Sequence, residues 1–188
     1  MNLLIAGVLL WTIGHLFPSF APGVRQNLID KLGAGPYRGV FALVIVSALV
    51  LIVLGWRSTS EEYLYVLPIW SRQLGFVLMY FSVFLLGAAH GKSLIKRYIR
   101  HPMLMGVFVW SVSHLLTNGT TRALILFGAL GLWALIEMPL INARNRDWVR
   151  PEATPLAAEL KGLVISAVVF AVLIWLHPYF AGVSPVPM

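Results

Sequence analysis

The sequence predicts an all-α fold, a polytopic membrane helix bundle with about six transmembrane helices. Of the 188 residues, 59% are hydrophobic and 11% are charged, whereas soluble domains have about 45–50% apolar and about 25% charged residues. Six apolar segments, each near the length that crosses a bilayer, run through the chain: 2–17, 38–56, 69–89, 102–117, 121–141 and 161–180. We see no soluble domain between them, so residues 1–188 are predicted to form a single transmembrane domain in contact with the lipid bilayer.

The first apolar segment is predicted to be a helix of the bundle and not a signal peptide. It has no basic stretch before Leu3 and no small-residue cleavage site around PSFAPG at 18–23. The loop that follows is expected to hold a short amphipathic turn at 24–32 and a glycine and proline break at 33–36. The loop after the fifth segment, NARNRDWVRPEATPLAAEL, is the most polar stretch and is expected to lie along the inner membrane surface.

Basic residues predict the orientation. The loops after the first, third and fifth segments hold 11 of the 14 lysines and arginines. These are Arg25, Lys31, Arg38, Lys92, Lys96, Arg97, Arg100, Arg144, Arg146, Arg150 and Lys161. The positive-inside rule places these three loops in the cytoplasm and both termini outside, in the periplasm of a bacterial cell. Because the basic residues serve topology in this way, no nucleic-acid partner is expected.

An internal repeat points to a functional site. The stretches GVLLWTIGHLFPS (7–19) and GVFVWSVSHLLTN (106–118) place glycine, tryptophan and histidine at positions i, i+4 and i+8, on one stripe of a helix. The matched residues are Gly7 with Gly106, Trp11 with Trp110, and His15 with His114. The glycines allow close approach to the backbone, and each tryptophan gives a flat wall one turn from its histidine. The two stretches lie in the first and fourth of six segments, a pattern compatible with a 3+3 inverted repeat.

The histidines suggest haem b as the cofactor. The chain has no cysteine, which excludes thiolate metal ligands and covalent c-type haem. Two buried neutral imidazoles suit a haem iron, one on each axial side, so we take His15 and His114 as the candidate iron ligands. Trp11 and Trp110 would line the site. Basic side chains nearby, Arg38, Arg100 and also Arg25, are candidates to pair with the propionates.

Spacing leaves the second ligand open. His101 and His114 lie about 20 Å apart along one helix, so they cannot share one iron. His15 and His114, counted from opposite faces of the membrane, differ in depth by about 10 Å. A pair formed by His15 with His90 or with His101 is therefore an alternative.

Three further ionisable groups need a role. His101 precedes Pro102 and forms a cationic cluster with Arg97 and Arg100 at a helix N-terminus, where it would bind an anionic group or anchor the topology. His177 is expected to be an interfacial side chain. Glu137 is a carboxyl group inside an apolar segment, and the sequence does not name its partner.

The motifs GHLFPS (14–19), HGKS (90–93) and RHPMLMGVFVWSVSHLLTNG (100–119) resemble the NnrU family of integral membrane proteins. This resemblance covers essentially the whole chain and implies a link to nitrite and nitric oxide metabolism in the inner membrane of denitrifying bacteria. The family is similar to 15-cis-zeta-carotene isomerase, a membrane protein that uses haem b. By that similarity the iron ligands fall on His15 and His114. The isomerase carries a cysteine three residues before the second ligand, whereas this chain has Ser111, so no thiolate is present there for a ligand swap.

A more remote similarity offers a different function. The pattern RHP-x-x-x-G at 100–106 is similar to the isoprenylcysteine carboxyl methyltransferases and the membrane methanethiol methyltransferases, which bind S-adenosylmethionine. The acidic pair that usually follows is missing, since only Glu137 and INARNRDW follow here. The sequence thus favours a haem b protein that senses or relays redox state or nitric oxide, or isomerises a small hydrophobic polyene. The alternatives are a methyltransferase and a non-enzymatic membrane factor for assembly of a denitrification enzyme.

Overall fold

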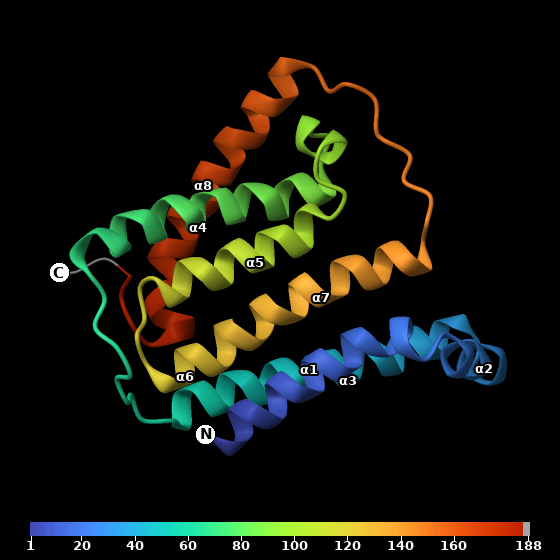
Figure 1. Cartoon of the computed structure of the whole chain (residues 1–188), viewed down its shortest axis with the longest axis horizontal. Helices are drawn as coiled ribbons and strands as arrows, with labels where there is room; N and C mark the ends of the chain where they lie inside the picture. Colours follow the sequence, from blue (N-terminus) through green and yellow to red (C-terminus); the bar gives the residue numbers. More distant parts are fainter. Residues whose placement is uncertain (186–188) are drawn as a thin grey trace.

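Apolar helices that alternate in direction build the bundle in the computed structural model, which describes residues 1–185 (Figure 1). The elements are α1 (Asn2–Phe20), α2 (Pro22–Leu32), α3 (Ala34–Ser58), α4 (Ile69–His90), η1 (Leu94–Arg97), α5 (Pro102–Leu115), α6 (Thr121–Ala123), η2 (Leu124–Gly128), α7 (Ala129–Arg144) and α8 (Leu156–Ala181). The π-helical turn η2 joins α6 and α7 into one continuous span. The predicted all-α bundle is confirmed.

Five of these helical spans are long and apolar enough to cross a membrane, and α5 is a shorter apolar helix. Its 14 residues extend about 21 Å at the rise of an α-helix, less than the roughly 30 Å hydrocarbon core. It lies between α4 and α7 and runs opposite to both (Figure 1). The fourth predicted segment, 102–117, is therefore present as a short helix packed between α4 and α7.

Proline and glycine set the helix boundaries. Pro22 and Pro102 occupy the first turns of α2 and α5, where their missing N–H groups leave no hydrogen bond unmade. Gly33 has a φ of 87°, a conformation that ends α2 and separates it from α3. The expected amphipathic turn at 24–32 is a complete helix that begins at Pro22.

The helices pack side by side in the order α3, α1, α7, α5, α4 and α8 (Figure 1). The apolar core lies where α1, η2 and α7 meet, and includes Leu4, Val8, Phe127 and Leu130. In contrast, α8 buries little of its surface and packs along α4. Many large apolar side chains of α3 and α8 are exposed, as expected of surfaces that face lipid.

The matched glycines of the repeat both lie at close helix crossings. A Cβ on Gly7 would lie 2.7 Å from the Ile52 backbone nitrogen of α3, and one on Gly106 would lie 3.0 Å from the Leu86 side chain of α4. The expected close approach is present at both. The partner helices differ, because α1 packs on the second apolar segment whereas α5 packs on the third.

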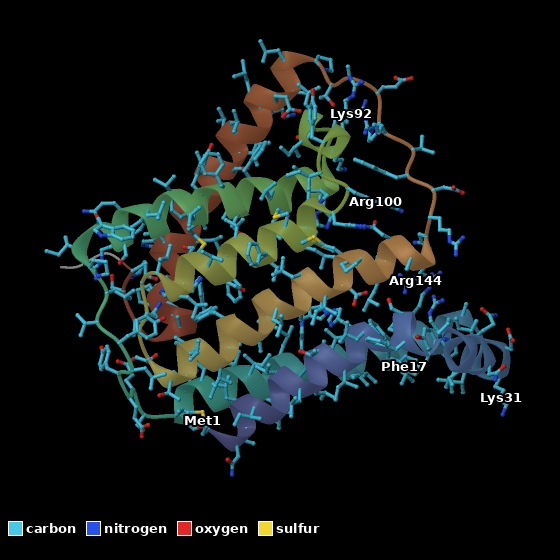
Figure 2. All side chains as sticks on the ribbon, in the orientation of Figure 1. Met1, Phe17, Lys31, Lys92, Arg100 and Arg144 are labelled. Carbon is cyan, nitrogen blue, oxygen red and sulfur yellow. The ribbon has the colours of Figure 1, made fainter. Side chains whose placement is uncertain are left out.

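The three basic loops share one end of the bundle. Lys31, Lys92, Arg100 and Arg144 lie at this end, and Met1 lies at the opposite end (Figure 2). We call them the basic end and the N-terminal end. Loops that follow alternate helices must lie at the same end of the bundle, so this arrangement agrees with the predicted distribution of basic loops. The side of the membrane that each end faces stays a prediction.

Candidate functional site

His15 lies in an aromatic site between α1, α3 and α7. Its ring centroid is 4.2 Å from that of Trp11, 4.9 Å from Trp133 and 6.0 Å from Phe41. The Nδ1 atom lies 3.0 Å from the Trp11 carbonyl oxygen. Because a carbonyl can only accept, Nδ1 carries the proton and Nε2 keeps its lone pair. Metal-binding imidazoles are prepared in this way.

His114 repeats this local geometry on α5. Its Nδ1 lies 2.9 Å from the Trp110 carbonyl oxygen, and its ring centroid lies 4.8 Å from that of Trp110. Phe127 stacks on it with centroids 4.1 Å apart and an interplanar angle of 18°. Phe127 belongs to the π-helical turn η2, a local irregularity that is often found at functional sites. The two halves of the sequence repeat therefore present their imidazoles alike.

The structure does not bring the rings of His15 and His114 together. His15 packs on Trp133 and His114 packs on Phe127. These two aromatic residues are six positions apart in one helical span, which corresponds to a rise of about 9 Å. In addition, α7 packs between α1 and α5. The ring centroid of His177, on α8, lies 6.5 Å from that of His114.

A pocket of about 650 Å³ opens at the basic end, next to the His15 site. Its lining residues are Pro18, Pro22, Arg25, Gln26, Tyr37, Arg38, Phe41, Arg144 and Asn145. Phe41 connects the two features, since its ring also contacts His15. Arg25 lies 5.8 Å from the centre of the Tyr37 ring. The pocket thus combines apolar walls with guanidinium groups, a combination that suits an apolar ligand with carboxylate groups.

The predicted cofactor residues Arg100 and His101 lie elsewhere. The Arg100 guanidinium donates to the carbonyl oxygens of Asp147 at 3.2 Å, Arg146 at 3.5 Å and Asn145. His101 Nε2 lies 2.8 Å from Asn142 Oδ1. Both side chains tie the start of α5 to the end of α7, and neither lines the pocket that holds Arg38.

Glu137 is buried on α7, one turn beyond Trp133, and its partner is Ser19. The Ser19 hydroxyl donates to Glu137 Oε1 at 3.2 Å and accepts from Arg144 at 3.2 Å. Within residues 1–185, Glu137 Oε2 and the indole Nε1 atoms of Trp11 and Trp133 are buried without a hydrogen-bond partner. Two of these atoms therefore belong to the indole rings that pack on His15, and buried polar groups of this kind are costly unless a ligand or water completes them.

Sequence reasoning missed the residues that complete both histidine sites. Phe41, Phe127 and Trp133 line the rings, but single aromatic residues on apolar helices carry no signal of their own. Ser19 is 118 positions from Glu137, so no local pattern connects them. His90, an alternative ligand in the sequence analysis, is exposed at the end of α4, where its Nδ1 lies 3.1 Å from the Leu86 carbonyl oxygen.

The fold and its site define a polytopic membrane protein with imidazoles held in aromatic surroundings. The family model described as NnrU protein matches residues 3–185, nearly the whole chain. The protein therefore belongs to the NnrU family, as the motifs predicted. Comparisons with curated proteins and with solved structures found no match.

Proposed function

We propose that the protein binds haem b in the inner membrane and serves nitrite or nitric oxide metabolism, with His15 and His114 as the candidate iron ligands. The observation that carries the proposal is the matched presentation of both imidazoles. Each donates its Nδ1 proton to the carbonyl of a tryptophan four residues earlier and keeps an Nε2 lone pair in an apolar site.

The volume of the pocket and the chemical types of its lining residues are compatible with haem. The 650 Å³ pocket falls within the range of about 300–1,000 Å³ that small-molecule sites occupy. Arg25 and Arg38 lie at its wall and are suited to bind two propionate groups. His15 adjoins this pocket through Phe41, which makes it the stronger candidate of the two histidines. Ligation of one iron by both histidines requires Trp133 and Phe127 to give way, because each ring now packs on one of them.

Bound haem would supply an iron that binds nitric oxide or exchanges electrons. The residues of the chain would hold and orient the haem and keep water away from it. His15 would hold the iron through Nε2, and the Trp11 carbonyl would fix the tautomer and orientation of its ring. Trp11 and Trp133 would exclude water from the ring. Arg25 and Arg38 would fix the edge of the porphyrin at the basic end.

The competing functions receive no comparable support. The methyltransferase interpretation uses Arg100 and His101 at the cofactor, but both side chains are engaged by the end of α7. The isomerase interpretation gains nothing from Ser111, which is buried against Gly131.

The test is the haem content of detergent-purified variants, measured by pyridine haemochrome and visible spectra. We expect His15→Ala to lose the haem. The matched control is His90→Ala, because His90 makes the same Nδ1 contact with a carbonyl four residues earlier but is exposed. If His114→Ala also loses the haem, the two histidines share one iron. If it keeps the haem, His15 is the sole protein ligand of the two. Haem retained at the wild-type level in both variants would contradict the proposal.

A further inference from the structure

A second pocket lies between α4 and α8 at the basic end, apart from the His15 site. Its volume is about 340 Å³, and the end of α4, the residues after it and the first turns of α8 form its walls. Glu159 of α8 contacts Ser93, and a Cβ on Gly87 would lie 3.6 Å from Ser166 Oγ. The two helices therefore pass each other in opposite directions with the pocket between them. Figure 2 shows Lys92 at this part of the basic end.

Two lysine residues line the outer part of this pocket. Lys92 lies one residue before Ser93, and Lys161 lies two residues after Glu159. Because Ser93 and Glu159 are hydrogen-bonded, the two lysines lie at the same level along the two helices. Within residues 1–185, neither ammonium group forms an ion pair with a carboxylate. The outer part of the pocket thus presents two cations without an anionic partner.

The carboxylate of Glu159 also lines the pocket, but neutral donors hold it. Its Oε2 atom accepts from the Ser93 hydroxyl at 3.1 Å, and its Oε1 atom accepts from the Leu94 backbone N–H. Two lysines and one glutamate therefore leave one net positive charge on the lining. A single phosphodiester group balances this charge, and its two free oxygens can each accept from an ammonium group.

The deeper part of the pocket is apolar. Phe84, Ala88 and Ile165 line it. Phe84 lies seven positions before Gly91, another lining residue, so the lining extends about 10 Å along α4 away from the basic end. Both α4 and α8 are long and apolar enough to span the membrane. Charged groups at the end of two such helices, with apolar walls further in, follow the polarity of a phospholipid and not that of a soluble anion.

We propose that this pocket binds the glycerol phosphate part of an anionic phospholipid. The volume of about 340 Å³ lies near the lower end of the roughly 300–1,000 Å³ of small-molecule sites, so the acyl chains extend beyond the pocket. Ile165 and Val168 of α8 are 50% and 59% exposed and give these chains an apolar surface. Basic pockets between transmembrane helices are suited to anionic headgroups. The proposal does not depend on haem.

A bound lipid would also stabilise the position of α8. This helix buries a single residue, Ser166, and packs mainly on α4. A lipid between α4 and α8 adds contacts to both helices. Because a ligand that binds only the folded state stabilises it, an anionic phospholipid should raise the melting temperature of the protein.

The experiment is native mass spectrometry of the delipidated, detergent-purified full chain, titrated with phosphatidylglycerol. We expect one lipid to bind saturably, and phosphatidylcholine with the same acyl chains to bind more weakly. One basic residue changes binding to anionic lipid about fivefold, so Lys92→Gln combined with Lys161→Gln should weaken binding about 25-fold. The matched control combines Lys31→Gln with Arg146→Gln. It removes the same charge at the basic end but outside the pocket, so it should bind as the wild type does.

Gly162→Leu tests the apolar part of the pocket without a change in charge. A Cβ at Gly162 would lie 3.9 Å from the Phe84 ring, an ordinary contact, so a larger side chain there fills the pocket. This variant should keep the melting temperature of the lipid-free wild type and lose the rise that phosphatidylglycerol gives the wild type.

Three results would overturn the proposal. The first is equal binding of phosphatidylglycerol by the double lysine variant and its matched control. The second is equal binding of phosphatidylglycerol and phosphatidylcholine by the wild type. The third is binding of soluble glycerol phosphate as tight as that of the lipid, which would identify a site for a soluble anion. Failure of the haem proposal gives a different result, because loss of haem in His15→Ala should leave lipid binding unchanged.

Discussion

Gly55 is predicted to be the most sensitive glycine at the crossing of α1 and α3. A Cβ at this position would lie 2.2 Å from the Leu4 backbone nitrogen and 2.5 Å from its Cα. Ordinary contacts begin at 3.4 Å, so Gly55→Ala must push the two backbones apart by about 1.2 Å. A gap of roughly 0.5–1 Å already forfeits a quarter to a half of the dispersion energy of a contact.

The expected cost follows from two opposing terms. Overpacking of this kind costs about 1–3 kcal/mol, and alanine regains up to about 1 kcal/mol of helix propensity over glycine. We expect a net loss of about 2 kcal/mol. For a chain of this size that lowers the melting temperature by roughly 4–8 °C.

The assay is thermal unfolding of detergent-purified protein followed by tryptophan fluorescence. Gly39→Ala is the matched control, because Gly39 lies on the same helix and a Cβ there has nothing within 4 Å. This control should equal or exceed the wild type in melting temperature. Equal melting temperatures for Gly55→Ala and Gly39→Ala would refute the close crossing of α1 and α3.

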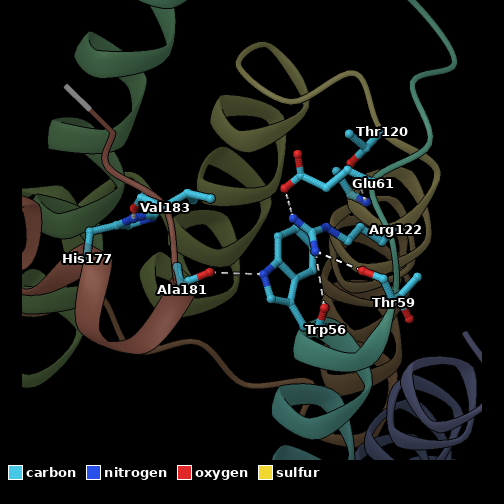
Figure 3. A network of polar contacts seen from close by, with 9 residues as sticks. Trp56, Thr59, Glu61, Thr120, Arg122, His177, Ala181 and Val183 are labelled. Carbon is cyan, nitrogen blue, oxygen red and sulfur yellow. Dashed lines mark hydrogen bonds and ion pairs between the residues drawn. The ribbon is translucent and has the colours of Figure 1, made fainter. Parts of the chain in front are cut away.

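Three other perturbations test separate parts of the account. Arg122 donates to the carbonyls of Trp56 and Thr59 and pairs with the exposed Glu61 (Figure 3). Because Arg122→Met leaves these carbonyls without their charged donor, it should destabilise by about 2–3 kcal/mol in the same thermal assay; a loss under about 1 kcal/mol would contradict its role. Burial raises the pKa of Tyr65, so the folded state favours the neutral phenol and the melting temperature should fall as pH rises above about 10. Tyr65→Phe should remove this fall, and the same pH profile in the wild type and the variant would contradict the role of Tyr65. Arg38→Ala should weaken haem binding about twofold to fivefold in a spectral titration, as expected of an exposed ion pair, whereas Arg100→Ala should bind haem as the wild type does. Weaker binding by Arg100→Ala alone would indicate that the propionates pair with Arg100 and not with Arg38.

Much of the fold could be predicted because apolar length and basic loops depend on composition alone. The six segments and the shared end of the basic loops were predictable in this way. The start of α5 at Pro102 was predicted as well, and its end at Leu115 lies two residues before that of the predicted segment 102–117. The helices that pack on Gly7 and Gly106 could not be predicted from the sequence. A glycine indicates that another helix can approach closely, but it does not identify that helix.

In the candidate site, too, features within one helix were predictable and contacts between helices were not. The presentation of His15 and His114 was predictable, because the i and i+4 spacing within one helix fixes the tryptophan beside each histidine. Their distance from each other depends on the span formed by η2 and α7, because His114 packs on Phe127 of η2 and His15 packs on Trp133 of α7. Sequence spacing between helices carries no such information. The approach of His177 to His114 was not predictable either, because the two rings belong to helices that are far apart in the sequence.

The most direct test of the central claim is the visible absorption spectrum of the purified wild-type protein, oxidised and reduced, combined with a pyridine haemochrome assay. The account predicts a sharp Soret band, resolved α and β bands on reduction, and about one haem b per chain. A protein that stays colourless after expression with added haem would contradict it.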